Sequence, residues 1–366
     1  MNVYPLKSLT IDEAIALQFD LVDAITQAFH GHEILTRGDL GLVPGLNQPK
    51  TTMKVEKVLA KFFASEDALL IRGSGTNAIR LALYATVGHG GTMLVHDAPI
   101  YPTTQVSINM LGIRTEKVDF NDLNAVAMKV KQNKFDGILI QVTRQKINDA
   151  YDLEELISAI REIDKNIFII TDDNYSALKT KKIGVQAGAT LSCFSSFKLL
   201  GPEGIGCIVG RKKEITKLKH DNYSGGGQVQ GHEAIDVIKG MIYAPVSLAI
   251  SSQVSDEVCS RLNSHECPDI LDAMVVNAQS KVIIVRLAEK IAKSVIAVAE
   301  IHGAITNPVG AESKYEFCPL FYRVSGTFRE SDPNAENYMI RINPNRAGAD
   351  TIIRILKQAI VEAKRE

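Results

Sequence analysis

Short apolar runs and amphipathic stretches alternate along the first 210 residues. The clearest apolar runs predict strands at 67–71, 92–96, 137–142, 167–171 and 206–210. Apolar residues at helical spacing predict helices near 11–30, 52–63, 75–86, 103–111, 122–132 and 152–163. Continuous apolar strands separated by helices are buried on both faces, which indicates a mostly parallel sheet flanked by helices. The pattern therefore predicts an α/β fold.

The pattern changes after about residue 213. Helical segments dominate from 228 to 301, strand-like segments follow at 321–326 and 338–343, and a closing helix is expected at 348–364 with Asp350 as its cap. This part of the chain is typical of a smaller α+β domain. The expected division is an N-terminal helix and interface loop at 1–50, a large domain at 51–245 and a small C-terminal domain at 246–366.

Composition narrows the class of protein. The 366 residues carry a net charge of −1, which gives no indication of a nucleic-acid partner. The five cysteines form no C-x-x-C pair, so reduced thiols are expected. The N-terminus has no apolar segment typical of a signal peptide, and the longest uncharged run, 240–255, is too short to span a bilayer. We expect a cytoplasmic protein without a membrane partner.

In parallel sheets, ligands bind beyond the carboxyl ends of the strands, so the residues that follow each strand are the first candidates. The loop after 67–71 places Ser74, Gly75 and Thr76 at the start of a helix, where free N–H groups and hydroxyls would bind a phosphate. The same loop matches the dinucleotide fingerprint G-x-G-x-x-A from Gly73 to Ala78. A plain helix cap is the simpler alternative.

Lys198 follows an apolar strand that begins at Leu191, and Ser195 precedes it by three residues. A buried lysine is costly unless it is paired or has lost its charge. Schiff-base chemistry removes that charge, because a desolvated amine is a nucleophile for an aldehyde. The alternative is a lysine whose stem packs on apolar surface while its ammonium reaches water.

Two further loops carry candidate residues. The strand 167–171 runs into Asp172 and Asp173, whose side chains point to opposite faces of the sheet. A buried carboxylate needs a cationic partner, such as a protonated pyridine nitrogen, and we choose Asp172 for this role, whereas a capping role suits Asp173 better. After the strand 92–96, Tyr101 could stack on a flat cofactor or simply pack in its loop.

A phosphate loop, a stacking aromatic, a strand-end aspartate and Ser195-x-x-Lys198 occur in this order along nearly the whole chain. The order resembles the fold-type I pyridoxal-phosphate (PLP) enzymes, the aspartate-aminotransferase superfamily, which implies the PLP-transferase fold and PLP as cofactor. By this likeness Lys198 would form a Schiff base with PLP and Asp172 would pair with its ring nitrogen. The resemblance also implies that Tyr101 stacks on the ring and that Tyr175, three residues after Asp172, is the aromatic residue often found there in these enzymes. The residues implied at the phosphate are Ser74, Gly75, Thr76 and Ser195.

The resemblance implies an enzyme that acts at the α-carbon of an amino acid, with Arg341 on the substrate carboxylate; Arg323 and Arg329 compete for that role. It also implies a homodimer or homotetramer, with the loop 36–50 and its Arg37 reaching into the partner's site. The lysine segment is similar to selenocysteine-synthase-like enzymes, the layout at 223–231 is similar to cystathionine and methionine lyase-related enzymes, and the whole chain resembles an uncharacterised bacterial group of aminotransferase-like proteins.

These likenesses favour an aminotransferase, with a β- or γ-eliminating C–S lyase as the alternative. An NAD-dependent oxidoreductase, using Gly73, Gly75 and Ala78 with Asp97, and a noncatalytic binding protein are the alternatives from other classes. Weaker candidates are Thr143 and Arg144, which could face the ring oxygen of PLP or lie on the surface, and His96, for which a structural role at a strand end is favoured. No metal site is expected, because His30 and His32 have no further ligands at metal spacing.

Overall fold

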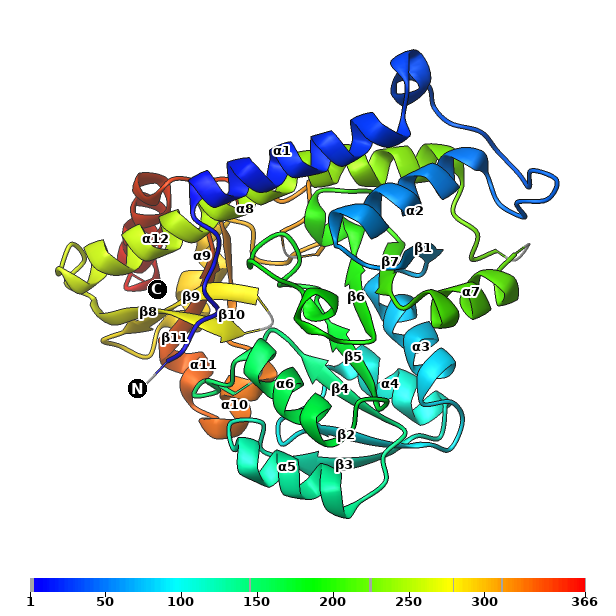
Figure 1. Ribbon diagram of the computed structural model, residues 1–366. Coiled ribbons are helices and arrows are strands. Elements are labelled where there is room, and N and C mark those ends of the chain that lie inside the picture. Colours follow the sequence, from blue (N-terminus) through cyan, green and yellow to red (C-terminus); the bar gives the residue numbers. More distant parts are fainter. Residues whose placement is uncertain (1–2, 145, 224–225, 279, 311, 366) are drawn as a thin grey trace. The chain divides into compact units, whose positions relative to one another are not determined.

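The computed structural model describes residues 3–144, 146–223, 226–278, 280–310 and 312–365 (Figure 1). The chain divides into two compact units. The large unit comprises Ile15–Val142 and Tyr151–Pro245, and the small unit comprises Met1–Ala14, Thr143–Ala150 and Val246–Glu366. The segment 15–50 thus groups with the large unit, and two short N-terminal and central segments group with the small one.

A seven-stranded sheet forms the centre of the large unit. Its strands are β1 (Asp67–Arg72), β2 (Thr92–His96), β3 (Arg114–Val118), β4 (Gly137–Gln141), β5 (Phe168–Asp172), β6 (Leu191–Ser195) and β7 (Ile205–Gly210). They lie in the order β1-β7-β6-β5-β4-β2-β3. The pairs from β6 to β3 are parallel, whereas β7 runs antiparallel to both β6 and β1. The predicted mostly parallel sheet is confirmed.

Two layers of helices cover the faces of this sheet. The helices are α2 (Lys50–Phe62), α3 (Ser74–Thr86), α4 (Pro102–Met110), α5 (Leu123–Gln132), α6 (Leu153–Ile163) and α7 (Lys212–Asp221), with α1 (Ile11–Ala28) before them and the short turns η1 (Gly31–Leu35), η2 (Gly184–Ala187) and η3 (Ser196–Leu199) between them. Neighbouring strand residues enter different cores: Ile170 packs with α3, and Ile169 packs with α6. This alternation is what a sheet buried on both faces requires.

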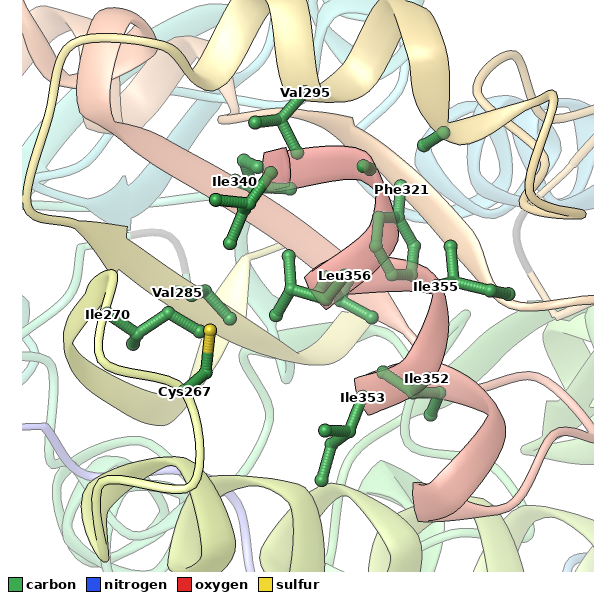
Figure 2. Close-up of a cluster of buried hydrophobic side chains, with 14 of the residues drawn as sticks. Cys267, Ile270, Val285, Val295, Phe321, Ile340, Ile352, Ile353, Ile355 and Leu356 are labelled. Carbon is green, nitrogen blue, oxygen red and sulfur yellow. The ribbon is translucent and has the colours of Figure 1, made fainter. Parts of the chain in front are cut away.

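The small unit is built on a four-stranded antiparallel sheet of order β10-β11-β9-β8. Its strands are β8 (Ile270–Ala278), β9 (Ser280–Leu287), β10 (Leu320–Arg323) and β11 (Met339–Asn343), and its helices are α9 (Ala292–Ala299), α10 (Gly326–Ser331), α11 (Ala335–Tyr338) and α12 (Ala349–Ala363). Figure 2 shows how Ile352 and Leu356 of α12 point into a core that also takes Ile340 of β11 and Val295 of α9. The expected α+β character is confirmed.

Three sequence-based expectations about the elements were wrong in detail. The expected helical stretch 228–301 contains the β8–β9 hairpin, and the strand β3 was not predicted at all. Gly348, not Asp350, caps α12; the Asp350 carboxylate pairs instead with Arg261, at 2.8 Å. The predicted cap Asp152 does accept hydrogen bonds from the first N–H groups of α6.

The helix α8 (Gly231–Asn263) is longer than the uncharged run within it and contains Pro245. By length and hydropathy it is the single candidate membrane span among the described residues. Half of its most apolar window is buried inside the protein, as in a core helix. A single helix of this length and hydropathy is weak evidence for a membrane role.

Candidate active site

Lys198 lies on a short turn that several contacts hold in place. The turn η3 directly follows β6 and ends at Leu200, whose φ of 61° is left-handed. The Ser196 hydroxyl donates to the carbonyls of Pro202 and Ile205, at 3.1 and 2.9 Å. The backbone of Gly240 in α8 packs so closely that a Cβ there would lie 2.4 Å from the Leu200 carbonyl oxygen. The hydrogen bonds of Ser196 and the close packing of Gly240 therefore fix the turn that carries Lys198.

The half-buried side chain of Lys198 extends over an aromatic ring. Its Nζ lies 3.9 Å from the centre of the Tyr175 ring, within the range of a cation–π contact. Lys179 approaches the same ring from further away, at 5.3 Å. The structure thus brings together two residues of the predicted site, Lys198 and Tyr175, and offers one rival amine.

Asp172 and Asp173 have different surroundings, as their alternation along the strand requires. Asp172 is half-buried. Burial raises its pKa above the ordinary value, while hydrogen bonds from Asn174 and the charge of Lys198 lower it in part. Asp173 is fully buried and accepts hydrogen bonds from the hydroxyls of Thr171 and Ser176, at 2.5 and 2.9 Å. Asp172 is therefore the carboxylate that faces Lys198. Asp173 has a structural role, but not the capping role that the sequence favoured: its carboxylate accepts from two hydroxyls and from the distant N–H of Gly184.

The predicted phosphate loop joins β1 to α3. The Ser74 and Ser195 hydroxyls lie 2.6 Å apart, although the two residues are distant in the sequence. The N–H groups of Gly73 and Ser74 both donate to the carbonyl of Gly204, which holds the loop against the start of β7. Ser74 has a φ of 60°, an uncommon value for a residue with a side chain that is often found at functional sites.

Thr76 connects this loop to the segment that carries Tyr101. The Thr76 hydroxyl donates to the Thr103 hydroxyl at 3.3 Å, and Tyr101 is the residue directly before α4. Tyr101 is half-buried. The start of α3 and the start of α4 are therefore neighbours at the same end of the sheet, which is where the sequence placed both residues.

Asn174 is a residue of this cluster that sequence reasoning missed. Its side-chain amide donates to Asp172 and its side-chain oxygen accepts from the N–H of Ser195, at 2.7 and 3.0 Å. An asparagine two residues after a strand-end aspartate is a common turn pattern, and that was the available signal.

Several weaker candidates have structural roles. His96 accepts a hydrogen bond from the N–H of Phe120 at 3.0 Å and stacks on the Phe120 ring, as expected for a structural histidine. Thr143 and Arg144 are buried in the small unit, not on the surface, and Arg144 donates to the carbonyl of Tyr4 at 2.8 Å. His30 and His32 are exposed, and the described residues contain no group of three or more side chains suited to a metal ion.

The three candidate arginines belong to the small unit. Arg341 is buried in the central part of β11, and its guanidinium carbon lies 3.8 Å from the centre of the Tyr322 ring. Arg323 is exposed at the end of β10, and Arg329 lies 3.9 Å from the carboxylate of Glu336. Of the three, Arg341 has the rigid, stacked setting that suits a bidentate clamp on a carboxylate.

The cluster in the large unit fits PLP. Asp172 is a half-buried carboxylate that faces Lys198, and a pyridinium nitrogen beside it would add a second positive charge. The paired hydroxyls of Ser74, at the start of α3, and Ser195, at the end of β6, suit a phosphate. The amine of Lys198 suits the aldehyde. Gly206 also packs closely, since a Cβ there would lie 2.2 Å from the carbonyl oxygen of Ser74.

The same loop does not fit a dinucleotide. β1 lies at the edge of the sheet and pairs antiparallel with β7, whereas the fingerprint G-x-G-x-x-A belongs after the first strand of a parallel half. The NAD alternative therefore lacks the strand arrangement on which it depends.

Comparisons with known proteins agree with this geometry. A family model described as Cys/Met metabolism PLP-dependent enzyme matches residues 46–276, and a model described as the YhfS-like C-terminal domain matches residues 256–356. The protein YhfS of Escherichia coli (strain K12) is 48% identical over 360 residues, which cover 98% of this chain and 99% of YhfS. The crystal structure of PLP-dependent YhfS gives a TM-score of 0.97 and covers 99% of this chain and 100% of that chain.

Two more distant relatives come from cystathionine metabolism. The structure of the cystathione gamma lyase of Micromonospora echinospora shares the fold at 13% identity, with a TM-score of 0.75 over 94% of this chain and 99% of that chain. Cystathionine gamma-synthase 1 of Nicotiana tabacum is 25% identical over 198 residues, which cover 52% of this chain and 36% of that protein. The chain therefore belongs to the Cys/Met metabolism family of PLP-dependent enzymes, as the resemblance to fold-type I enzymes predicted.

Proposed function

We propose that the protein is a PLP-dependent lyase that eliminates a sulfur- or oxygen-linked group from the side chain of an amino acid. The match of residues 46–276 to the Cys/Met metabolism family is the observation that supports elimination over transamination. The relatives named for cystathionine support it further. An aminotransferase, the first choice from the sequence, has no comparable support.

PLP, when bound, supplies an electron sink that makes the α-proton of an amino acid acidic. Lys198 is the residue that can accept this proton at Nζ, because it lies at the centre of the cluster and is half-buried. Asp172 would stabilise a positive charge on the ring nitrogen of bound PLP. Tyr175 contacts the Lys198 amine through its ring and restricts where that amine lies.

Elimination also needs a proton for the leaving sulfur or oxygen atom. For a β-leaving group, Lys198 can return the proton that it took from the α-carbon. For a γ-leaving group, a proton of the β-carbon must also be removed, and Lys198 can carry that proton as well. The C–S or C–O bond breaks, and the leaving group departs with its electron pair and gains a proton that Lys198 carries. Water then hydrolyses the released enamine to a 2-oxo acid and ammonia, which completes the balance of atoms.

Arg341 is our proposed contact for the substrate carboxylate. An Arg341→Lys variant should raise KM for the amino acid about 10-fold or more while cofactor binding stays unchanged, because a bidentate hydrogen-bonded pair is lost. Arg323→Lys is the matched control, since Arg323 lies nearby on the paired strand β10 but is exposed. Equal KM values for the two variants would remove Arg341 from the proposal.

We also propose a homodimer or larger assembly in which the loop 36–50 contacts a second copy. Asp39 anchors this loop, since its carboxylate accepts from the N–H groups of Lys50 and Thr51, at 2.7 and 2.9 Å. Beyond the anchor the loop exposes Leu40, with 72% of its surface accessible. A Leu40→Asp variant should shift the molecular mass measured by light scattering towards that of a monomer.

The reaction is tested by incubating the PLP-loaded protein with cystathionine, an S-alkylcysteine and an O-acylhomoserine. We expect 2-oxo acid, ammonia and the leaving group in equal amounts from at least one of them, without any amino acceptor. Lys198→Ala should abolish product formation, and Lys179→Ala, which removes the rival amine near Tyr175, should retain it. Product that forms only with an added 2-oxo acid would contradict the lyase and establish a transaminase.

A further inference from the structure

Asn174 makes three hydrogen bonds that join separate parts of the cofactor site. Its backbone N–H and its side-chain Nδ2 both donate to the same oxygen of Asp172, at 3.1 and 2.7 Å. Its Oδ1 accepts from the backbone N–H of Ser195 on the neighbouring strand, at 3.0 Å. Ser195 in turn bonds to Ser74. One side chain therefore connects the carboxylate expected at the ring nitrogen to the hydroxyl pair expected at the phosphate.

Gly75 packs directly against the side chain of Asn174. A Cβ at Gly75 would lie 2.3 Å from Oδ1 and 2.7 Å from Nδ2 of Asn174, distances that real Cβ atoms do not adopt. Gly75 is buried and has no left-handed φ that would require glycine, so close packing is the reason for its small size. The first turn of α3 can approach β5 and β6 only because position 75 has no side chain.

The electrostatic surroundings of Asp172 give Asn174 a second role. Burial raises the pKa of Asp172, and the side-chain bond from Asn174 is the strongest counteracting influence, followed by the charge of Lys198. On the paired strand β6 the nearest titratable group is Cys193, a thiol whose own pKa is raised by burial. On β4 the paired residue is Gln141, which is uncharged, and Gly75 and Ala78 of α3 carry no charge. Asp173 belongs to the hydrogen-bonded group of Thr171 and Ser176.

We propose that Asn174 is a positioning residue for the cofactor: it holds the Asp172 carboxylate at a fixed spacing from the Ser74–Ser195 pair. The proposal depends on PLP as the cofactor and not on which bond the enzyme breaks. Without the amide of Asn174, the pKa of Asp172 would rise further, and its attraction for a protonated ring nitrogen would weaken.

The sharpest test replaces one hydrogen-bond donor without a change of shape. In Asn174→Asp the oxygen that accepts from Ser195 remains, but an oxygen replaces Nδ2 opposite Asp172. We expect the dissociation constant of PLP, measured by absorption titration of the apoprotein, to rise about 10- to 100-fold at neutral pH, as for the loss of a hydrogen bond to a charged group.

The pH dependence separates positioning from a general structural effect. A proton shared by the two carboxyl groups at low pH restores a hydrogen bond between them, whereas two ionised carboxylates repel each other, so the defect of Asn174→Asp should be smaller at pH 6 than at pH 8.5. Asn166→Asp is the matched control, because it adds the same charge in the exposed loop before the same strand. That control should bind PLP as the parent does at both pH values.

A size exchange tests the packing separately. Gly75→Ala should weaken PLP binding and lower the melting temperature of the apoprotein, because its Cβ displaces Asn174. The double variant Gly75→Ala with Asn174→Ala should regain most of the melting temperature, since the new methyl group has room, but it should still bind PLP weakly. Recovery of PLP affinity in the double variant would show that Asn174 acts only by filling space, and would overturn the proposal.

An Asn174→Asp variant with the parent's PLP affinity and pH dependence would also overturn it. These measurements use the cofactor alone and need no substrate. A protein that binds PLP but releases no 2-oxo acid would contradict the proposed lyase while leaving the role of Asn174 intact.

Discussion

The two faces of the large sheet differ at the ends of β5 and β6. On the face covered by α3, Asp172 bonds to Asn174 and faces Lys198, and Ser195 bonds to Ser74 of α3. On the opposite face, Asp173 and Ser192 take part in a closed set of hydrogen bonds. The sequences of both faces look alike, with one aspartate and one serine each.

The two faces differ in how completely hydrogen bonds within the protein satisfy the polar side chains. Ser192 bonds to Thr171 at 2.8 Å and accepts from the N–H of Val185 at 2.8 Å, and Asp173 accepts from Gly184 as well as from its neighbouring hydroxyls. Such a closed set stabilises the fold. The Asp172 face instead gathers an amine, a carboxylate and two hydroxyls where a ligand can complete them. A polar residue at a strand end is thus functional or structural according to its face.

Removing the amine on the Asp172 face should have the largest effect. Lys198→Ala should lower turnover by at least about 100-fold, since the group that moves the α-proton is lost. The melting temperature of the apoprotein should change little, because the Lys198 side chain is only half-buried and the buried residues Ser196 and Leu199 of the same turn are unchanged. A steady-state assay with each variant at saturating PLP measures this effect. A Lys198→Ala variant that turns over substrate within a factor of two of the parent rate would show that Lys198 does not move the α-proton.

Substitution of the two aspartates should affect different properties: turnover at Asp172 and stability at Asp173. Asp172→Ala should lower turnover about 100-fold through the loss of charge stabilisation while the protein stays folded. Asp173→Ala should leave Thr171, Ser176 and Gly184 without their acceptor and cost about 2–3 kcal/mol of unfolding free energy. Urea denaturation and the activity assay on both variants check this. If Asp173→Ala were the more damaging to turnover per folded molecule, the assignment of the faces would be reversed.

The serines offer a smaller version of the same contrast. Ser195→Ala should weaken PLP binding about 10-fold, as for one lost hydrogen bond, with little loss of stability. Ser192→Ala should lower the unfolding free energy by about 1–3 kcal/mol, since it leaves the N–H of Val185 unsatisfied, and should leave PLP affinity unchanged. Absorption titration and denaturation of the two variants are compared directly.

The smallest effect concerns pH. Burial raises the pKa of Asp173 to about 6 in the folded protein, above that of an unfolded chain. The folded protein therefore binds more protons than the unfolded one between about pH 4 and pH 6, and the contribution of Asp173 to stability falls as pH rises through this window. In Asp173→Asn this contribution is absent, so the variant should gain stability relative to the parent between pH 4.5 and pH 7. If the unfolding free energies of Asp173→Asn and the parent differ by the same amount at pH 4.5 and at pH 7, the raised pKa of Asp173 is contradicted.

Much of the fold could be predicted because the buried strands are nearly uniform apolar runs. β4 and β5 illustrate this, and their neighbours along the chain carry a clear helical period. The edge strand β3 has the sequence RTEKV, which is polar because the edge of the sheet is partly exposed, and so it has no apolar signal. The β8–β9 hairpin was missed although Pro268 and Asp269 mark a turn between α8 and β8, because short apolar runs are not assigned to strand or helix by periodicity alone.

Those residues of the candidate site that lie at or just after the end of a strand could be proposed from the sequence. Lys198, Asp172 and Ser74 could be named from their positions alone. Asn174 could not, because its role depends on the N–H of Ser195 and on the missing side chain of Gly75, and both come from distant parts of the sequence. The antiparallel direction of β7, which excludes the dinucleotide site, is likewise set by tertiary pairing.

The central claim is that one amine, on the face of Asp172, holds the cofactor. The direct measurement is treatment of the PLP-loaded protein with borohydride, followed by peptide mapping by mass spectrometry. The account predicts the phosphopyridoxyl mass on the peptide that contains Lys198, with none on Lys179 near the same Tyr175 ring. The label on Lys179 or on any other lysine, or no label at all, would contradict it.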